Sequence, residues 1–172
     1  TGMGLYQSKD RGETWGHLTY RNTFRIGYPD KLIFSPRDDR TMFICGSHAN
    51  PGTWIKLHTA NAAVMVSHDV GETWSLASKG MPDPLTANLE AMCLYDAGDR
   101  FELFIGTTDG KVYYSDDGAE NWRQIAGDLA PVSKVEHFRL LLRKRLHALQ
   151  RHLLDQRGRD EPDRAVAGVR GD

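Results

Sequence analysis

The chain has 172 residues, with 22 lysines and arginines against 23 aspartates and glutamates, so its formal net charge is −1. This length is enough to bury a sizeable core as one domain. The balanced charge excludes a domain-wide attraction to nucleic acid, and no apolar run is long enough to cross a bilayer as a helix. We therefore expect neither a nucleic-acid partner nor a membrane partner.

Residues 1–19 predict a β-hairpin. A strand over 4–7 leads into the turn Ser8-Lys9-Asp10-Arg11-Gly12-Glu13-Thr14-Trp15, and a second strand follows over 15–19. The Asp side chain of such a turn accepts backbone N–H bonds, and its Gly supplies a positive φ that other residues resist. The Trp leaves the turn to bury a large apolar surface. A polar connection, 20–30, leads to the next strand.

Two four-stranded units follow the hairpin. The strands of the first unit, which spans 31–77, are predicted at 31–34, 41–46, 62–66 and 74–77. Those of the second unit, which spans 88–126, are predicted at 89–95, 101–106, 111–114 and 122–126. Short strands between frequent Gly, Pro and Asp turns indicate an all-β protein. The units differ mainly in the loop 47–61 of the first unit, whose counterpart in the second unit is much shorter.

Beyond residue 126 the pattern changes. Residues 128–135 predict an edge or closing strand, and residues 137–157 have a helical period with a leucine stripe and basic flanks. Such a basic amphipathic helix packs on its own domain or another subunit, docks on an anionic membrane or in a partner groove, or mediates assembly. Residues 158–172 are rich in Gly, Arg and Asp, and we expect them to be disordered.

The turn of the hairpin recurs twice. Ser67-His68-Asp69-Val70-Gly71-Glu72-Thr73-Trp74 repeats the Ser, Asp, Gly, Thr and Trp at the same places, and Ser115-Asp116-Asp117-Gly118-Ala119-Glu120-Asn121-Trp122 is a looser copy that keeps the Ser, Asp and Trp. In the third copy Gly118 stands one place earlier and Asn121 replaces Thr, which leaves the geometry of that turn open. Each copy is preceded by strand-forming residues, so each joins two strands.

This repeated turn resembles the Asp box, or BNR repeat, of sialidase-like β-propellers, whose pattern is S-x-D-x-G-x-T-W. The resemblance implies four-stranded blades around a shared axis. Because a closed propeller needs about 4–8 blades, we expect an incomplete ring over 1–136, with the end of one blade and two full blades. We also expect each box Trp to be buried between adjacent blade sheets. The box residues are Ser8, Asp10, Gly12, Thr14, Trp15, Ser67, Asp69, Gly71, Thr73, Trp74, Ser115, Asp117 and Trp122.

The face opposite the boxes is the expected ligand face, since the resemblance places substrates there and functional residues gather on loops held by a rigid scaffold. It would collect the loop 47–61 and the connections between blades. Trp54 would serve as a stacking platform for a sugar, with Asn50 and Asn88 bonding its hydroxyls. The proposed ligand-binding residues are Arg21, Arg25, Tyr28, His48, Asn50, Trp54, Lys56, His58 and Asn88.

A catalytic alternative needs two carboxyl groups at a defined separation. Glu90 paired with Asp83 or Glu136 is the available candidate, and Glu90 as a polar channel residue is the alternative interpretation. Phe24-Arg25-Ile26 is similar to the Phe-Arg-Ile-Pro element of sialidases, in which the Arg binds a carboxylate. Gly27 replaces the Pro, however, and the element follows a box instead of preceding the first one, so we expect Arg25 to be an ordinary loop residue.

The sequence leaves two functions open. One is a ligand- or protein-binding scaffold that acts through the face opposite the boxes. The other is a glycoside hydrolase, similar to exo-sialidases, whose catalytic residues are shared with blades absent from this chain. The expected partners are a carbohydrate or protein ligand and the missing blades, from the parent chain or another subunit.

We expect no metal and no cofactor. The spacing of His17, His48, His58 and His68 fits no metal signature, and Cys45 and Cys93 lie in apolar strands as free thiols. Because Thr1 stands within repeat sequence, we expect the start of the parent protein to be missing. The compartment stays open, with the cytoplasm slightly favoured.

Overall fold

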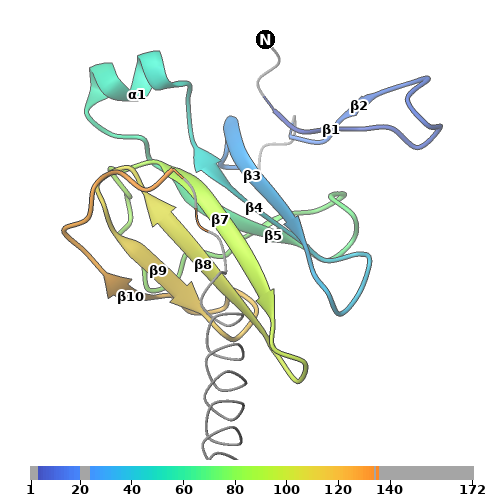
Figure 1. Cartoon of the computed structure of the whole chain (residues 1–172). Helices are drawn as coiled ribbons and strands as arrows, with labels where there is room; N and C mark the ends of the chain where they lie inside the picture. Colours follow the sequence, from blue (N-terminus) through green and yellow to red (C-terminus); the bar gives the residue numbers. More distant parts are fainter. Residues whose placement is uncertain (1–3, 20–23, 134, 136–172) are drawn as a thin grey trace, which may run out of the picture. The chain divides into compact units, whose positions relative to one another are not determined.

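The computed structural model describes residues 4–19, 24–133 and 135, all within the unit Thr1–Glu136. Three antiparallel sheets and one short helix make up this part of the chain (Figure 1). The all-β prediction is therefore confirmed for the described residues. The helix expected at 137–157 and the tail at 158–172 lie outside them. No helix of the described part is long and apolar enough to span a membrane.

The smallest sheet is the N-terminal hairpin. Its strands are β1 (Tyr6–Gln7) and β2 (Gly16–His17), which pair antiparallel with Tyr6 opposite His17. The rings of these two residues stack, with centroids 4.5 Å apart. The hairpin therefore forms where the sequence predicts it, with only two paired residues in each strand.

The other two sheets are four-stranded meanders, in which each strand pairs with the next one along the chain. The first sheet contains β3 (Tyr28–Phe34), β4 (Met42–Ser47), β5 (Ala63–Ser67) and β6 (Ser75–Leu76). The second sheet contains β7 (Leu89–Asp96), β8 (Phe101–Thr107), β9 (Val112–Ser115) and β10 (Arg123–Ala126). All eight predicted strands are present, and β3 begins earlier than the predicted Lys31.

Two segments differ from expectation. The loop 47–61 contains the helix α1 (Pro51–Leu57), which Asn50 caps by accepting the Thr53 N–H. Asn followed by Pro at the first helical position is a helix-start signal that the loop prediction overlooked. In 128–135 the described residues form no strand. Leu129 makes one hydrogen bond to the turn between β8 and β9, and Val132 makes one to the end of β8. Pro131 has no N–H and cannot continue a ladder between them.

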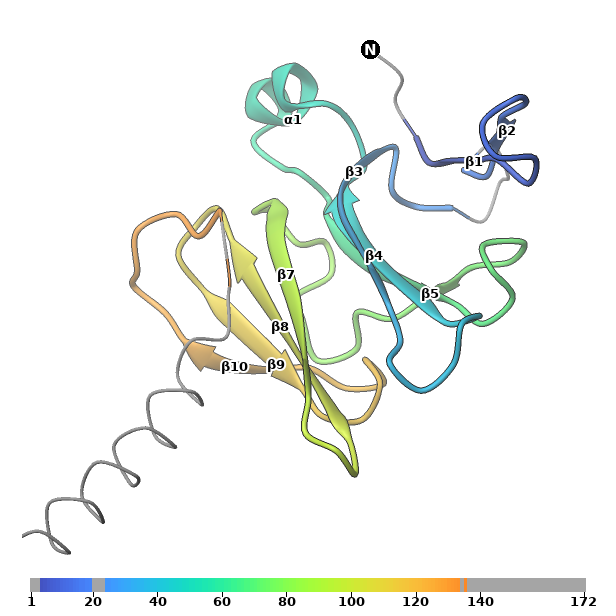
Figure 2. The same ribbon diagram turned by 45° about the vertical axis from the view of Figure 1, so that its right-hand side comes forward.

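The two central strands of the first sheet, β4 and β5, are buried on both faces. Along β4, Phe43 and Cys45 belong to the main core between the two four-stranded sheets, while Met42 and Ile44 belong to a smaller core toward the hairpin. This alternation is the two-residue period of a strand. The first strands of the two sheets, β3 and β7, contact each other (Figure 2), so the sheets lie closest along these edges.

The second turn, 67–74, is closed by the side chains that recur in the sequence. The Ser67 hydroxyl donates to Asp69 Oδ1 at 2.8 Å and accepts the Gly71 N–H at 2.8 Å. Asp69 also accepts the Thr73 N–H at 2.8 Å and the Thr73 hydroxyl at 2.6 Å. The first turn, 8–15, has the same bonds. One carboxylate therefore satisfies the polar groups across each turn.

The third turn, 115–122, has the same geometry despite its different residues. In all three turns the fourth and fifth places have positive φ, and here they are Gly118 (φ 73°) and Ala119 (φ 69°). A Gly at either place relieves one of the two strained positions. Asn121 donates its side-chain NH₂ to Asp117 Oδ2 at 2.9 Å, which replaces the bond from the Thr hydroxyl. The altered sequence thus preserves the turn.

The three tryptophans of these turns differ in burial. Trp74 is 9% exposed and packs edge-on against Phe24, and Trp122 is 4% exposed and donates its indole N–H to the Ala77 carbonyl of the preceding sheet at 2.7 Å. Trp15 is 63% exposed. The expectation that every one of these side chains is buried is therefore wrong for Trp15, because no described element covers the outer side of the hairpin.

Candidate functional site

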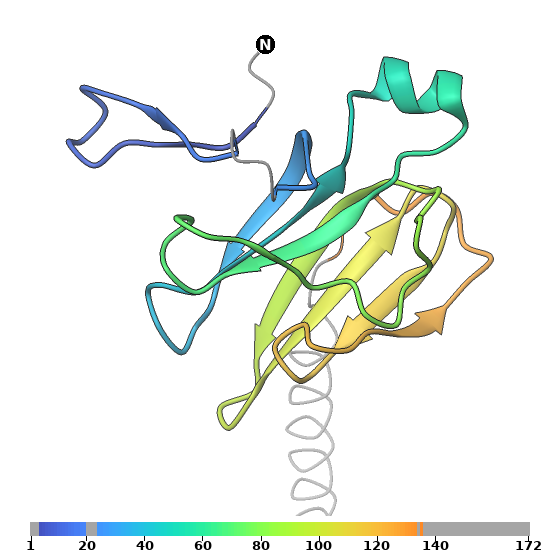
Figure 3. The ribbon, with the colours of Figure 1, turned by 180° about the vertical axis from the view of Figure 1, so that it is seen from behind.

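The loop end of the two four-stranded sheets, where β3 and β7 begin, holds most of the residues proposed from the sequence. It also carries α1 and the connection 78–88 between the sheets (Figure 3). Tyr28 is half-buried at the start of β3, and Lys56 is exposed in the last turn of α1. Arg21 and Glu136 lie outside the described residues.

Arg25 is held by neighbouring side chains. Its guanidinium donates to Asn61 Oδ1 at 2.8 Å and forms a salt bridge with Asp83. The hydrogen bond to Asp83 raises the pKa of Arg25, and the bond from Arg25 lowers the pKa of Asp83. Asp83 is therefore ionised at neutral pH and is poorly suited to donate a proton as the partner of Glu90.

The residues proposed in the loop 47–61 mainly stabilise the loop itself. Asn50 is the N-cap of α1, and His58 ends the helix in the left-handed conformation. His48 Nδ1 lies 3.0 Å from the Arg25 carbonyl oxygen. Trp54 packs half-buried against the main core, and its indole nitrogen is buried without a hydrogen-bond partner among the described residues. Asn50 and His58 therefore serve the two ends of α1, and Trp54 serves the core.

Two carboxylates occupy equivalent positions near the start of β3 and β7, the first strands of the two four-stranded sheets. The register of β3 against β4 shifts between Pro29 and Lys31, so Asp30 is the unpaired residue of a bulge. The register of β7 against β8 shifts between Leu89 and Ala91, so Glu90 is unpaired in the same way. Bulges bend a strand and re-aim a side chain, and they are common beside functional sites. Both sheets therefore repeat the same irregularity at an acidic residue.

Asn88 links these two positions. Its side chain is 1% exposed, and its NH₂ donates to Asp30 Oδ2 at 3.0 Å. Its backbone is fixed by Thr108, which accepts the Asn88 N–H and donates its own N–H to the Asn88 carbonyl. The side-chain oxygen of Asn88 is buried and has no hydrogen-bond partner among the described residues. A buried acceptor without a donor is costly unless a ligand or water supplies one.

The electrostatics of this polar cluster, defined as Asp30, Asn88 and Glu90, also differ from those of a solvated surface. Asp30 still reaches solvent, yet desolvation by its neighbours raises the pKa of its carboxyl, and the charge of Glu90 raises it further. The hydrogen bond from Asn88 lowers it. A carboxyl group beside another carboxylate, with amide and carboxylate oxygens around it, favours ligands that carry hydrogen-bond donors.

The sequence predicts two of the three residues of this cluster, Asn88 and Glu90, as candidate site residues, but not Asp30. The missing signal is the correspondence of the two units, because the Asp of Asp30-Lys31-Leu32 and the Glu of Glu90-Ala91-Met92 take the same place near the start of the first strand of each unit. In the sequence Asp30 is the last residue of the predicted polar connection 20–30, so it is not expected in a strand. The bulge that makes the two residues equivalent follows from the register of the neighbouring strands.

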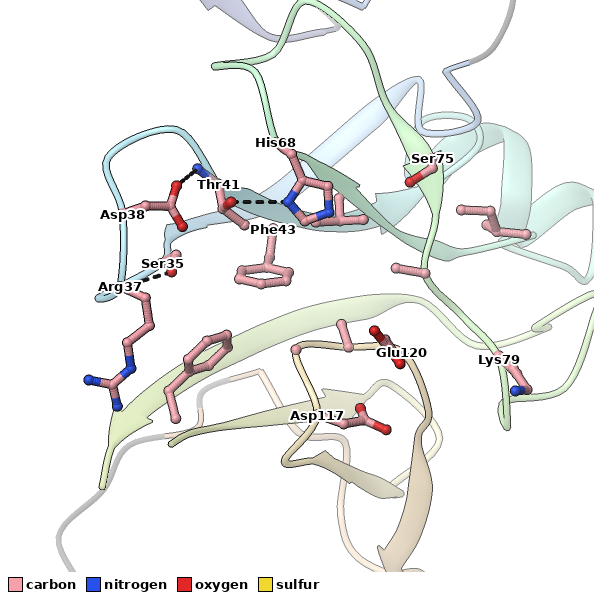
Figure 4. A pocket seen from close by; sticks show the side chains of 16 residues that line it. Ser35, Arg37, Asp38, Thr41, Phe43, His68, Ser75, Lys79, Asp117 and Glu120 are labelled. Atoms are coloured by element: carbon pink, nitrogen blue, oxygen red, sulfur yellow. Dashed lines mark hydrogen bonds between the residues drawn. The ribbon is translucent and has the colours of Figure 1, made fainter. Parts of the chain in front are cut away.

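A cleft of about 610 Å³ lies at the opposite end of the sheets, which we call the turn end. It is lined by the segment 35–41 after β3, by β6 and the start of the connection 78–88, and by the second and third turns. Figure 4 shows Thr41 and His68 on one side, Asp117 and Glu120 on the other, and Phe43 between them. No residue of this cleft was proposed as ligand-binding from the sequence.

Within the described residues, no group of three or more His, Cys, Asp and Glu side chains is arranged to hold a metal ion. No family model matches the chain, and no curated protein matches it.

Proposed function

We propose that the described residues form part of a sialidase-like Asp-box β-propeller that binds a ligand through its loop end. Two features support the propeller architecture. The two four-stranded meanders follow each other in the chain with their first strands, β3 and β7, in contact. Each meander carries one turn of the Asp-box pattern between its third and fourth strands. Radially arranged blades have this order of strands, with the first strand innermost.

The exposure of Trp15 supports an incomplete ring. The equivalent Trp74 and Trp122 are covered on the side of the preceding sheet. A blade before the hairpin would cover Trp15 in the same way. The missing blades are therefore proposed as partners, supplied by the parent chain or by another subunit.

The polar cluster carries the proposal of ligand binding. Repeated bulges place Asp30 and Glu90 at the ends of the innermost strands, and the buried oxygen of Asn88 lacks a donor in the described structure. Sugar hydroxyls and amino groups are donors that such oxygens accept. We therefore propose a carbohydrate or another donor-rich ligand at the loop end, close to the axis around which the blades are arranged.

An NMR titration of the full chain with a panel of methyl glycosides tests this proposal. Amide shifts should change in a saturable way around Asn88, and Asp30→Asn and Glu90→Gln should each weaken binding. Asp99→Asn is the matched control, because Asp99 is an exposed carboxylate in the turn between β7 and β8. Binding that is equally strong in the cluster variants and in the control would contradict the assignment of this site.

Glycoside hydrolysis is the second candidate function. A general acid needs a raised pKa beside a second carboxylate that stays ionised. The raised pKa of Asp30 fits this role better than Asp83, and Glu90 is the neighbouring carboxylate. The hydrolase would then use Asp30 with Glu90 instead of the pairs proposed from the sequence, and further catalytic groups would come from missing blades.

Fluorogenic 4-methylumbelliferyl glycosides separate the two functions. A binding scaffold should release no more fluorophore than its Asp30→Asn, Glu90→Gln double variant. Turnover by the unmodified chain that this double variant abolishes would favour the hydrolase. Turnover that survives in the double variant would exclude the polar cluster as its source.

A further inference from the structure

The cleft at the turn end is separate from the polar cluster, since it opens between the two sheets at the opposite ends of their strands. Its volume of about 610 Å³ falls within the range of small-molecule sites, about 300–1,000 Å³. Its walls come from five separate segments, which the packing of the first sheet on the second brings together. The sheet core therefore holds the walls in place.

The interior of the cleft is apolar. Phe43 and Phe101 line it with their ring centroids 5.8 Å apart and their planes inclined by 56°. Val66, Ala77 and Ala119 also line it and are buried, whereas Leu76 lines it with an exposed side chain. An inclined pair of rings suits a third aromatic or a branched aliphatic group, which would lose little hydration on entering.

Most charged groups at the rim already have partners. Arg37 forms a salt bridge with Asp96 at 2.8 Å. Asp38 accepts the N–H groups of Arg40 and Thr41. Asp117 is used within the third turn by Ser115 and Asn121. These bonds hold the groups against the protein and give the cleft its shape, so the groups are less available to a ligand than charged groups without a partner.

Lys79 and Glu120 are different. Both line the cleft and are exposed, and neither forms a salt bridge with another described residue. Lys79 lies just after β6, whereas Glu120 belongs to the third turn. The rim thus offers one ammonium group and one carboxylate beside an apolar interior.

A ligand that satisfies all three features carries a carboxylate, an ammonium group and an apolar side chain. We propose that the cleft binds a free amino acid with an aromatic or branched side chain. Its carboxylate would face Lys79, its ammonium group would face Glu120, and its side chain would lie against Phe101 and the exposed Leu76 at the apolar wall of the cleft. This site does not depend on the proposed function, because it shares no residue with the polar cluster.

An ¹⁵N–¹H NMR titration of the full chain with L-phenylalanine tests the proposal. Saturable shifts are expected at the second and third turns and around Lys79. Three probes each lack one feature: 3-phenylpropionate lacks the ammonium group, 2-phenylethylamine lacks the carboxylate, and glycine lacks the side chain. Each should bind at least about threefold more weakly than phenylalanine, as expected for the loss of one partly solvated contact.

Two rim variants complete the test. Lys79→Gln and Glu120→Gln should each weaken phenylalanine binding about threefold to tenfold. The controls are Glu13→Gln and Arg11→Gln, which change an exposed carboxylate and an exposed cation of the first turn; both should leave binding unchanged. An absence of saturable shifts, equal binding of 3-phenylpropionate, or full binding by Glu120→Gln would overturn the proposal. Shifts confined to the loop end would also overturn it.

Discussion

Single side chains explain how the third turn tolerates a changed pattern. Its Asn121 donates to Asp117 from a side-chain NH₂, where Thr73 donates to Asp69 from a hydroxyl. In each turn the donor bonds the Oδ2 atom of that turn's own Asp. The turn therefore requires a donor at this place, and the identity of the residue matters less.

Asn121→Thr is accordingly expected to change the free energy of unfolding by less than about 0.5 kcal/mol. Asn121→Val, which has the shape of Thr but no donor, should cost about 1 kcal/mol because one hydrogen bond is lost. Urea unfolding at neutral pH measures both. Equal stability of the two variants would show that the side-chain bond contributes nothing.

The carboxylates of the turns also make stability depend on pH. Hydrogen bonds from Thr14 lower the pKa of Asp10 from 3.8 to about 2, and those from Thr73 lower the pKa of Asp69 to about 2. A lowered pKa in the folded state gives stability that is present above the unfolded value, about 3.9, and is lost as pH falls toward the folded value. Acid should therefore weaken the turns between about pH 4 and pH 2.

Thermal unfolding between pH 7 and pH 2 tests this expectation. The midpoint of the unmodified chain should fall most steeply below about pH 4. In the double variant Asp10→Asn, Asp69→Asn the midpoint should start lower at pH 7 and fall less over the same range, because these two groups no longer titrate. Identical slopes would show that other carboxylates carry the acid sensitivity.

At the scale of elements, the connection between the two sheets depends on one glycine. Gly80 has φ +93°, and a Cβ there would clash with the backbone of Trp122. Trp122 also donates its backbone N–H to the Lys79 carbonyl at 2.8 Å. The connection thus runs directly against the start of β10, and only a residue without a side chain fits.

Gly80→Ala should destabilise the chain more than Gly98→Ala. Gly98 has nearly the same φ, +95°, but nothing lies within 4 Å of its Cβ position. Both variants incur the left-handed strain of about 1–2 kcal/mol, and Gly80→Ala adds the clash. Urea unfolding curves of the two variants give the difference, and equal costs would show that the connection moves aside freely.

At the scale of the whole molecule, the three turn tryptophans report where sheets are covered. Trp122→Ala should cost about 3–5 kcal/mol, since it empties a buried site. Trp15→Ala should change the free energy of unfolding by no more than about 0.5 kcal/mol, because its side chain is exposed in this chain. Chemical denaturation followed by circular dichroism compares the two. A large cost for Trp15→Ala would mean that this side chain is covered in solution.

Iodide quenching of fluorescence gives an independent test of the proposal that a further blade covers Trp15. The chain has four tryptophans, and Trp15→Phe should remove its most readily quenched component. In a longer parent protein that supplies a sheet before the hairpin, Trp15 should be protected from iodide. Unchanged quenching in such a protein would contradict the proposal that a blade covers this face.

Much of the fold is predictable because its signals are local. A Ser, an Asp, two positions with positive φ and a donor close each turn within eight residues, so the turns can be recognised in the sequence. Strands follow from short apolar segments between turns. The strand predicted at 128–135 does not form in the described residues. Apolar residues alone do not show whether a neighbouring strand offers a continuous ladder of hydrogen bonds, and Pro131 interrupts such a ladder because it has no N–H.

The candidate sites were predicted less well because they depend on contacts between residues far apart in the chain. The sequence by itself determined the three turns, the eight strands of the two meanders and the presence of Asn88 and Glu90 at the start of the second meander. Only the tertiary structure decided that Asp30 joins them, since the register of two sheets creates both bulges. It also paired Arg25 with Asp83, opened the cleft beside Phe43 and left Trp15 exposed, because each of these depends on which sheet packs against which.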